Sequence, residues 1–127
     1  MIDTELFIQE ATDYGFTSYS GVPCSFLKEF INYIIDSPEI YYIPAANEGD
    51  AIAIAAGVYL GGEYSVVMLQ NSGLGNAINP ITSLLQTFEI PVLIVVTLRG
   101  DPSAPLDEPQ HRLMGDITTD LLDLMKI

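Results

Sequence analysis

Two short, mainly aliphatic runs, residues 65–69 and 91–97, constrain the possible folds of this chain more than any other feature. Continuous runs of this kind are typical of strands that are buried on both faces, because a strand with one solvent-facing side would alternate apolar and polar residues. The stretch between them, about residues 75–88, is predicted to be a helix. A strand, a helix and a second strand in this order indicate parallel strands joined by a helical crossover.

The remainder of the chain follows the same alternation of helix and strand. Apolar residues at three- and four-residue steps indicate amphipathic helices, and short runs of β-branched and aromatic residues indicate strands. Asn47 is placed to cap a helix, and we expect Pro80 in the first turn of its helix, where the missing N–H is not needed. One α/β domain is predicted, a three-layer sandwich with a mostly parallel sheet. Further helices are expected near residues 2–14, 27–35, 48–60 and 117–125, strands at 17–20 and 41–43, and a loop at 99–115.

The composition excludes several classes of partner. The chain has 17 acidic and 4 basic side chains, which leaves a formal net charge of −13 at pH 7. Nucleic acid and membrane surfaces are therefore poor partners, since both are anionic and are bound by clustered lysine and arginine. The single cysteine, Cys24, cannot form an internal disulfide or a cysteine-based zinc site. We expect a cytoplasmic protein without a targeting or membrane-spanning segment.

In parallel α/β sheets the ligand crevice lies at the carboxyl ends of the strands. Four segments of this chain are expected there: residues 21–25, 45–50, 70–76 and 99–112. Candidate functional residues are therefore expected in these segments.

Glu48 opens a helix whose residues 51–60 are apolar on every face. A helix of this kind must be covered all round, so we expect a partner surface against it, with Glu48 near the seam. Glu48 could simply complement the helix dipole. Alternatively, it is a buried carboxyl group whose pKa is raised by desolvation and which shares a proton with a ring nitrogen of a bound cofactor.

Residues 70–76 (QNSGLGN) follow a buried strand and open a helix. Small residues and free amides at a helix N-terminus favour contact with an anion or a polar ligand. The segment has neither the G-x-G-x-x-G nor the G-x-x-x-x-G-K-[ST] pattern of nucleotide sites. It is equally consistent with a tight turn.

Residues 99–112 gather Arg99, Arg112 and the only histidine, His111, in one loop of an acidic chain. This clustering favours a site that holds an anion. Alternatively, His111 is an ordinary surface residue and the two arginines neutralise acidic neighbours in the loop. The spacing of these acidic residues matches no metal site, so no metal ligand is predicted in this chain. They are Asp101, Asp107 and Glu108.

Four segments in this order, residues 21–25 (GVPCS), 47–49 (NEG), 70–76 and 107–111 (DEPQH), resemble the pyrimidine-binding domain of thiamine-diphosphate-dependent enzymes. The resemblance covers nearly the whole chain, and it extends to the phosphonopyruvate decarboxylases in particular and to the alpha subunits of sulfopyruvate decarboxylases. It implies thiamine diphosphate as the cofactor and decarboxylation of a 2-oxo acid, phosphonopyruvate to phosphonoacetaldehyde and CO2. Sulfopyruvate decarboxylation, or a non-catalytic α/β module that binds an anion, is the alternative.

In this family the glutamate of the Asn-Glu-Gly segment bonds an aminopyrimidine nitrogen of the cofactor, and the resemblance gives Glu48 that role. His111 falls where related pyruvate decarboxylases carry the first of two histidines, with Arg112 in place of the second. Ser25 replaces an acidic residue of those enzymes, which suits a dianionic substrate because a repulsive charge is removed. The predicted residues are Glu48 and His111 for catalysis; Glu48, Asn71, Ser72 and Gly73 for the cofactor; and Cys24, Ser25, Arg99, Gln110 and Arg112 for the substrate.

The resemblance also implies that the chain is half of an active site. The family's diphosphate-binding domain carries a Gly-Asp-Gly motif and a downstream asparagine that hold Mg²⁺, and the triplet does not occur in this sequence. We therefore expect residues 1–127 to be the pyrimidine-binding domain, with a diphosphate-binding domain or beta subunit as its partner, Mg²⁺ held by that partner, and a homo-oligomer. The last residues, directly after a predicted helix, favour an excised N-terminal domain over a natural alpha subunit.

Overall fold

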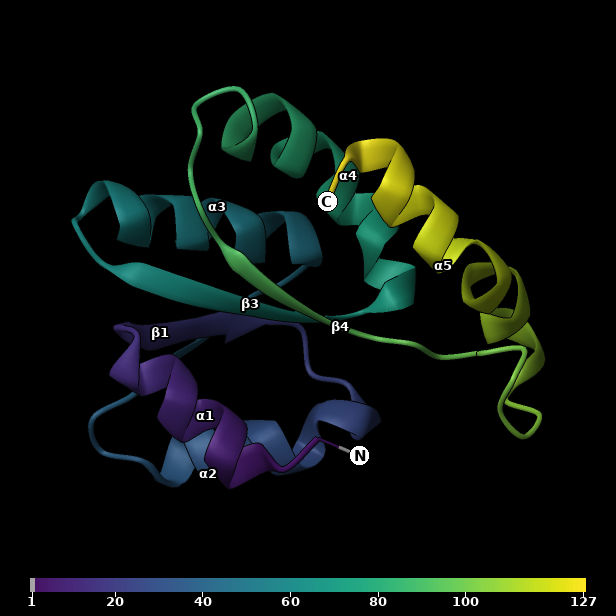
Figure 1. Ribbon diagram of the computed structural model, residues 1–127, viewed down its shortest axis with the longest axis horizontal. Helices are drawn as coiled ribbons and strands as arrows, with labels where there is room; N and C mark the ends of the chain where they lie inside the picture. The colour runs from purple at the N-terminus through teal and green to yellow at the C-terminus, as the bar shows by residue number, and fades with distance from the viewer. Residues whose placement is uncertain (1) are drawn as a thin grey trace.

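The computed structural model describes residues 2–127, which form a four-stranded parallel sheet with helices on both faces (Figure 1). The strands lie in the spatial order β2-β1-β3-β4, and each pairs in parallel with its neighbours. All four carboxyl ends therefore meet at one edge of the sheet. The predicted α/β sandwich is confirmed. The strands are β1 (Phe16–Gly21), β2 (Tyr41–Pro44), β3 (Tyr64–Gln70) and β4 (Leu93–Thr97).

Helices form the two outer layers. Helices α1 (Thr4–Asp13) and α2 (Lys28–Asp36) cover one face, and α3 (Glu48–Leu60), α4 (Leu74–Pro80) and α5 (Arg112–Met125) lie on the other (Figure 1). Each layer has its own apolar core against the sheet. None of the helices within residues 2–127 has the length and apolar character needed to cross a bilayer. The shorter helical turns are η1 (Ser25–Leu27), η2 (Asn71–Gly73), the π-helical η3 (Ile81–Leu85) and η4 (Pro109–His111).

The two aliphatic runs have different environments. Residues 65–69 of β3 are buried on both faces, as predicted, with exposed fractions of 0–2%. The run 91–97 differs from the prediction, because β4 forms an edge of the sheet and its residues are only partly buried. Within residues 2–127, no strand pairs with the outer side of β4.

Helix α3 begins where the sequence predicts. Asn47 is its N-cap: the side-chain oxygen accepts from the Asp50 backbone N–H at 3.1 Å, and Nδ2 donates to Asp50 Oδ2 at 2.8 Å. The helix is covered on one side only, since Ile52 is fully buried while Ala53 and Gly57 are exposed. A partner surface over the exposed side stays a prediction.

Pro80 was predicted in the first turn of its helix. In the structure it is instead the last residue of α4. Without an N–H, Pro80 cannot donate to the carbonyl one turn back. The chain continues as the wider turn η3, after which Gln86 N donates to Ile81 O at 2.9 Å. The single helix predicted over residues 75–88 is therefore two helical segments joined at a proline.

Helix α5 begins at Arg112, earlier than the predicted start at residue 117. Gly115 lies inside this helix, where glycine is unfavourable for helix stability. Its lack of a side chain permits a close backbone approach, because an added Cβ would overlap the carbonyl oxygen of Gly100. The loop that follows β4 is therefore shorter than predicted, and it packs directly on α5.

Candidate active site

Residues from three strand ends meet at the carboxyl edge of the sheet. Cys24 follows β1, and its Sγ donates to Gln70 Oε1 at the end of β3, at 3.3 Å, and lies 3.8 Å from Thr97 Oγ1 at the end of β4. The connection from β1 to β2 runs through α2 on one face, whereas the connection from β3 to β4 runs through α4 on the other (Figure 1). The space between β1 and β3 is therefore the switch point of the sheet, where ligands bind in folds of this kind.

Glu48 is the first residue of α3 and lies half-buried against η2. Asn76 Nδ2 donates to Glu48 Oε2 at 2.9 Å. Gly73 lies directly beside the same carboxyl group, since a Cβ on Gly73 would overlap the Cγ, Cδ and Oε1 atoms of Glu48. The other oxygen, Oε1, accepts no hydrogen bond from any residue between 2 and 127. The carboxyl group is thus held through one oxygen and open at the other.

Asn71 connects η2 with the loop after β4 and with α5 through a buried side chain. It is fully buried (0% exposed), its Nδ2 donates to Arg99 O at 2.9 Å and Thr118 Oγ1 at 3.0 Å, and its Oδ1 accepts from Arg99 N at 3.2 Å. The Asn71 side chain thus contacts protein groups and ties η2 to the loop after β4 and to α5. A contact between Asn71 and a cofactor stays a prediction. Ser72 is exposed, and its Oγ accepts from Gln70 Nε2 at 2.7 Å.

Arg99 pairs with Asp107, as one of the two interpretations of this loop predicts. Its Nε and Nη2 donate to the two oxygens of Asp107, each at 2.6 Å. Its Nη1 donates to Ser25 Oγ at 3.3 Å, and its guanidinium lies 4.4 Å from the centroid of the Phe26 ring. The hydrogen bonds from Arg99 hold the pKa of Asp107 well below its usual range. Nη1 is therefore the one guanidinium nitrogen of Arg99 that faces away from this ion pair.

His111 lies against the same carboxylate. Its Nδ1 is buried 3.1 Å from Asp107 Oδ2, although the two groups are not aligned as a hydrogen bond. The side chain is only 12% exposed, so the interpretation of His111 as an ordinary surface residue is wrong. Gln110 and Arg112, which flank it, are exposed.

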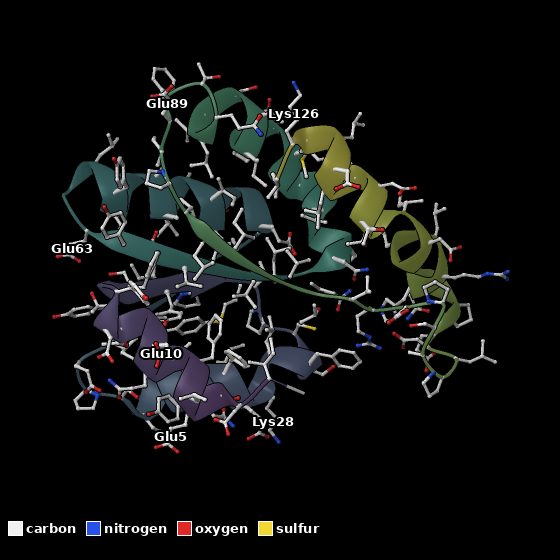
Figure 2. The ribbon with its side chains drawn as sticks, in the orientation of Figure 1. Glu5, Glu10, Lys28, Glu63, Glu89 and Lys126 are labelled. Carbon is white, nitrogen blue, oxygen red and sulfur yellow. The ribbon has the colours of Figure 1, made fainter. Side chains whose placement is uncertain are left out.

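The positive charges of the chain are unevenly distributed. Figure 2 shows Lys28 and Lys126 on the outside of the molecule, at the start of α2 and the end of α5. The other two cations, Arg99 and Arg112, flank the loop that follows β4. Half of the positive charge of a strongly acidic chain thus belongs to this loop.

Two contributors to the site were not singled out from the sequence: Asn76 and Phe26. Asn76 lies in the segment 70–76, which predicted its position but not its role. Phe26 had no such signal, because its contact with Arg99 joins residues that are close only in the folded chain.

Comparison with known proteins identifies the family. The family model "Thiamine pyrophosphate enzyme, N-terminal TPP binding domain" matches residues 3–123. The chain belongs to this family. The resemblance inferred from the four sequence segments is therefore confirmed.

The relatives extend beyond the length of this chain. A phosphonopyruvate decarboxylase from Streptomyces viridochromogenes is 48% identical over 124 residues, which are 98% of this chain and 31% of that protein. A sulfopyruvate decarboxylase subunit alpha from Methanococcus maripaludis is 37% identical over 124 residues, or 98% of this chain and 73% of that subunit. The chain thus spans about a third of the length of the first relative.

A solved structure agrees with the fold. A thiamine diphosphate-dependent 4-hydroxybenzoylformate decarboxylase from Rhodococcus jostii superposes with a TM-score of 0.69 at 20% identity, covering 88% of this chain and 22% of that chain. At this identity the likeness concerns the fold.

Proposed function

We propose that this chain is the pyrimidine-binding part of a thiamine-diphosphate-dependent decarboxylase that converts phosphonopyruvate to phosphonoacetaldehyde and CO2. The family and the 48% identity to a phosphonopyruvate decarboxylase support this proposal. The observation that carries it is the carboxyl group of Glu48, which Asn76 holds through one oxygen and which lies over a glycine. When bound, thiamine diphosphate supplies the electron sink that decarboxylation of a 2-oxo acid requires.

The residues around Glu48 fit this cofactor. A carboxyl group with one free oxygen can accept a hydrogen bond from, or share a proton with, a heterocyclic nitrogen. Gly73 places no side chain against that oxygen, whereas a Cβ at this position would overlap it. In this proposal Glu48 holds the proton shared with the pyrimidine ring, Ser72 and Gly73 line the same ring, and Asn71 keeps η2 in place.

The loop after β4 would bind the second anionic group of the substrate. Arg112 is exposed and forms no ion pair within the described part of the chain, and Arg99 presents Nη1 beside Ser25. Guanidinium groups form strong, directional hydrogen bonds to phosphonate oxygens. His111 would exchange a proton through Nε2, because Nδ1 faces Asp107. The residues proposed for the substrate are Cys24, Ser25, Arg99, Gln110 and Arg112.

Sulfopyruvate is the second candidate substrate. It is favoured by the sulfopyruvate decarboxylase subunit alpha, of which this chain covers 73%. Both candidates are three-carbon 2-oxo acids with a second anionic group, so the arginines of the loop would serve either.

The proposed active site is completed by other protein groups. That relative is named as a subunit alpha, which implies a second subunit in that enzyme, and the phosphonopyruvate decarboxylase is about three times as long as this chain. We propose that residues 1–127 form the pyrimidine-binding domain, and that a diphosphate-binding domain or beta subunit supplies the remaining groups and holds Mg²⁺.

The test is Glu48→Gln in the full-length protein, assayed with thiamine diphosphate, Mg²⁺ and each 2-oxo acid. Glutamine keeps the shape and the contact with Asn76 but cannot share a proton, so kcat should fall by at least about 100-fold, the usual contribution of an acid–base group. Calorimetric titration should show that much of the cofactor affinity remains. Glu63→Gln, an exposed glutamate beyond the other end of α3 (Figure 2), is the matched control and should keep normal turnover. Normal turnover by Glu48→Gln would eliminate the role proposed for this carboxyl group.

A further inference from the structure

One carboxylate organises the loop between β4 and α5. Asp107 Oδ2 accepts from Arg99 Nε at 2.6 Å and from Gly100 N at 3.0 Å. Oδ1 accepts from Arg99 Nη2 at 2.6 Å and from Glu108 N at 2.8 Å. The Asp107 side chain is only 18% exposed. Four donors on two oxygens leave this carboxylate little freedom to reorient.

His111 has contacts at its ring and at its backbone. Its Nδ1 lies 3.1 Å from Asp107 Oδ2, within hydrogen-bond distance, and is buried without any other partner. Its backbone lies against Gly100, because a Cβ on that residue would overlap the carbonyl group of His111. Gly100 also has a φ of +72°, a backbone conformation that favours glycine. Both its conformation and its close approach to His111 therefore require glycine at this position. Nε2 is the ring nitrogen left for an external group.

We propose that Asp107 is a positioning residue that acts through His111, holding the imidazole as the Nδ1–H tautomer and so presenting the lone pair of Nε2 to the substrate. A neutral imidazole has one donor and one acceptor nitrogen, and an ionised carboxylate can only accept. The proton therefore belongs on Nδ1, and a small rotation of the ring aligns the bond, as happens in many sites when substrate binds. The catalytic consequence rests on the proposed function, whereas the tautomer does not.

Arg99 makes this arrangement possible. Because its guanidinium engages both oxygens of Asp107, the carboxylate stays ionised and available as an acceptor at neutral pH. The contacts of Arg99 with Ser25 and Phe26 tie the same unit to the loop after β1. Asp107 thus contacts both Arg99, a predicted substrate residue, and His111, the predicted acid–base residue. Ser25, a further predicted substrate residue, is joined to them through Arg99.

The first test measures the tautomer in the unsubstituted full-length protein. Two-bond ¹H–¹⁵N spectra distinguish a protonated from an unprotonated ring nitrogen, and His111→Gln assigns the signal because it removes one imidazole. At a pH where the ring is neutral, we expect Nδ1 to carry the proton and Nε2 to lack it. A neutral ring protonated on Nε2 would overturn the proposal, and this result requires no folded Asp107 variant.

The second test is kinetic. Asp107→Asn should lower kcat about 10- to 100-fold, the usual effect of removing a group that orients a functional histidine. Asp101→Asn is the matched control, because Asp101 lies in the same loop but its carboxylate accepts, among residues 2–127, only from Ser103. It should change kcat less than about 2-fold, in line with a substitution away from the histidine.

A double-mutant cycle separates positioning from loop stability. If Asp107 acts through the imidazole, Asp107→Asn should have little further effect on kcat once His111→Gln is present. Fully multiplicative losses would mean that Asp107 supports the loop independently of His111, and would overturn the proposal. If the unsubstituted protein decarboxylates neither 2-oxo acid, the proposed function fails, while the tautomer measurement still decides the role of Asp107.

Discussion

At the scale of single residues, the candidate site depends on a position where no side chain fits. The three atoms nearest to a Cβ on Gly73 all belong to the flexible side chain of Glu48. Gly73→Ala should therefore displace the carboxyl group at little cost in fold stability. We expect turnover to fall about 100-fold, the effect of misplacing a reacting group by about 1 Å. Gly75→Ala is the control, because a Cβ there meets nothing within 4 Å. Equal activities for the two variants would contradict this assignment.

Tyr19 carries a prediction about stability. It is 1% exposed, and its hydroxyl is buried without a partner among the described residues. Removing an unpaired buried hydroxyl removes its desolvation cost, so Tyr19→Phe should leave the free energy of unfolding unchanged or raise it by about 1 kcal/mol at neutral pH. Urea titration of the variant and of Tyr14→Phe, whose ring is 76% exposed, measures this difference.

The same residue gives that prediction a pH dependence. Burial raises the pKa of Tyr19 to about 12 from its ordinary value of 10.0. Between these two values the unfolded chain loses the phenol proton and the folded chain keeps it, so the folded state loses stability as pH rises. The unsubstituted protein should lose up to about 3 kcal/mol more than Tyr19→Phe by pH 12. Parallel stability curves for the two proteins above pH 10 would show that the hydroxyl is not buried in this way.

Some site residues were predictable from sequence and others were not, for a physical reason. Glu48 and Gly73 lie at strand-to-helix junctions, which periodicity and turn residues locate. Asp107 reaches Arg99 across eight residues of irregular loop, and Asn71 reaches Thr118 across 47 residues. Contacts of this kind leave no periodic signal. The contact of Asn71 was therefore not predicted, and the Arg99–Asp107 pair was only one of two interpretations of its loop.

At the scale of secondary-structure elements, local sequence signals predicted where helices and strands occur. They predicted less well how each element packs against the rest of the chain. The β3 run and the Asn47 cap were both located correctly, because burial on two faces and capping each leave a local pattern. The edge position of β4 depends on strand order, and the early part of α5 packs against Gly100, which is distant in the sequence. Neither has a local pattern.

Two glycines in helix interiors should respond oppositely to the same substitution. In α3, Gly57→Ala meets nothing within 4 Å and should raise the free energy of unfolding by up to about 1 kcal/mol, the gain in helix propensity. In α5, Gly115→Ala would overlap the backbone of Gly100 and should lower it by about 1–3 kcal/mol, as overpacking does. Thermal denaturation of both variants checks the pair. Stabilisation by Gly115→Ala would show that the loop after β4 does not pack on α5.

At the scale of the whole molecule, two of the places where residues 2–127 expose apolar surface bear on assembly. The outer side of α3 includes Ala53 and Leu60, of which Leu60 is 76% exposed, and β4 has no neighbour on its outer side within these residues. Exposed apolar surface of this kind marks contact sites with other protein surfaces. The net charge of −13 acts against self-association, because like copies repel one another at low ionic strength.

These opposing effects lead to a prediction for assembly. We expect the full-length protein to be an oligomer that buries the outer side of α3, and to associate more tightly as added salt shortens the range of repulsion to about 8 Å at 0.15 M.

Ala53→Glu places a charge on that side and should release smaller species, because a buried charge without a partner is strongly unfavourable. Leu6→Glu, at a 61% exposed position on α1, should leave the assembly unchanged. Sedimentation velocity of the three proteins measures the outcome. A strictly monomeric unsubstituted protein at about 100 μM would count against a large apolar interface, since obligate interfaces persist well below that concentration.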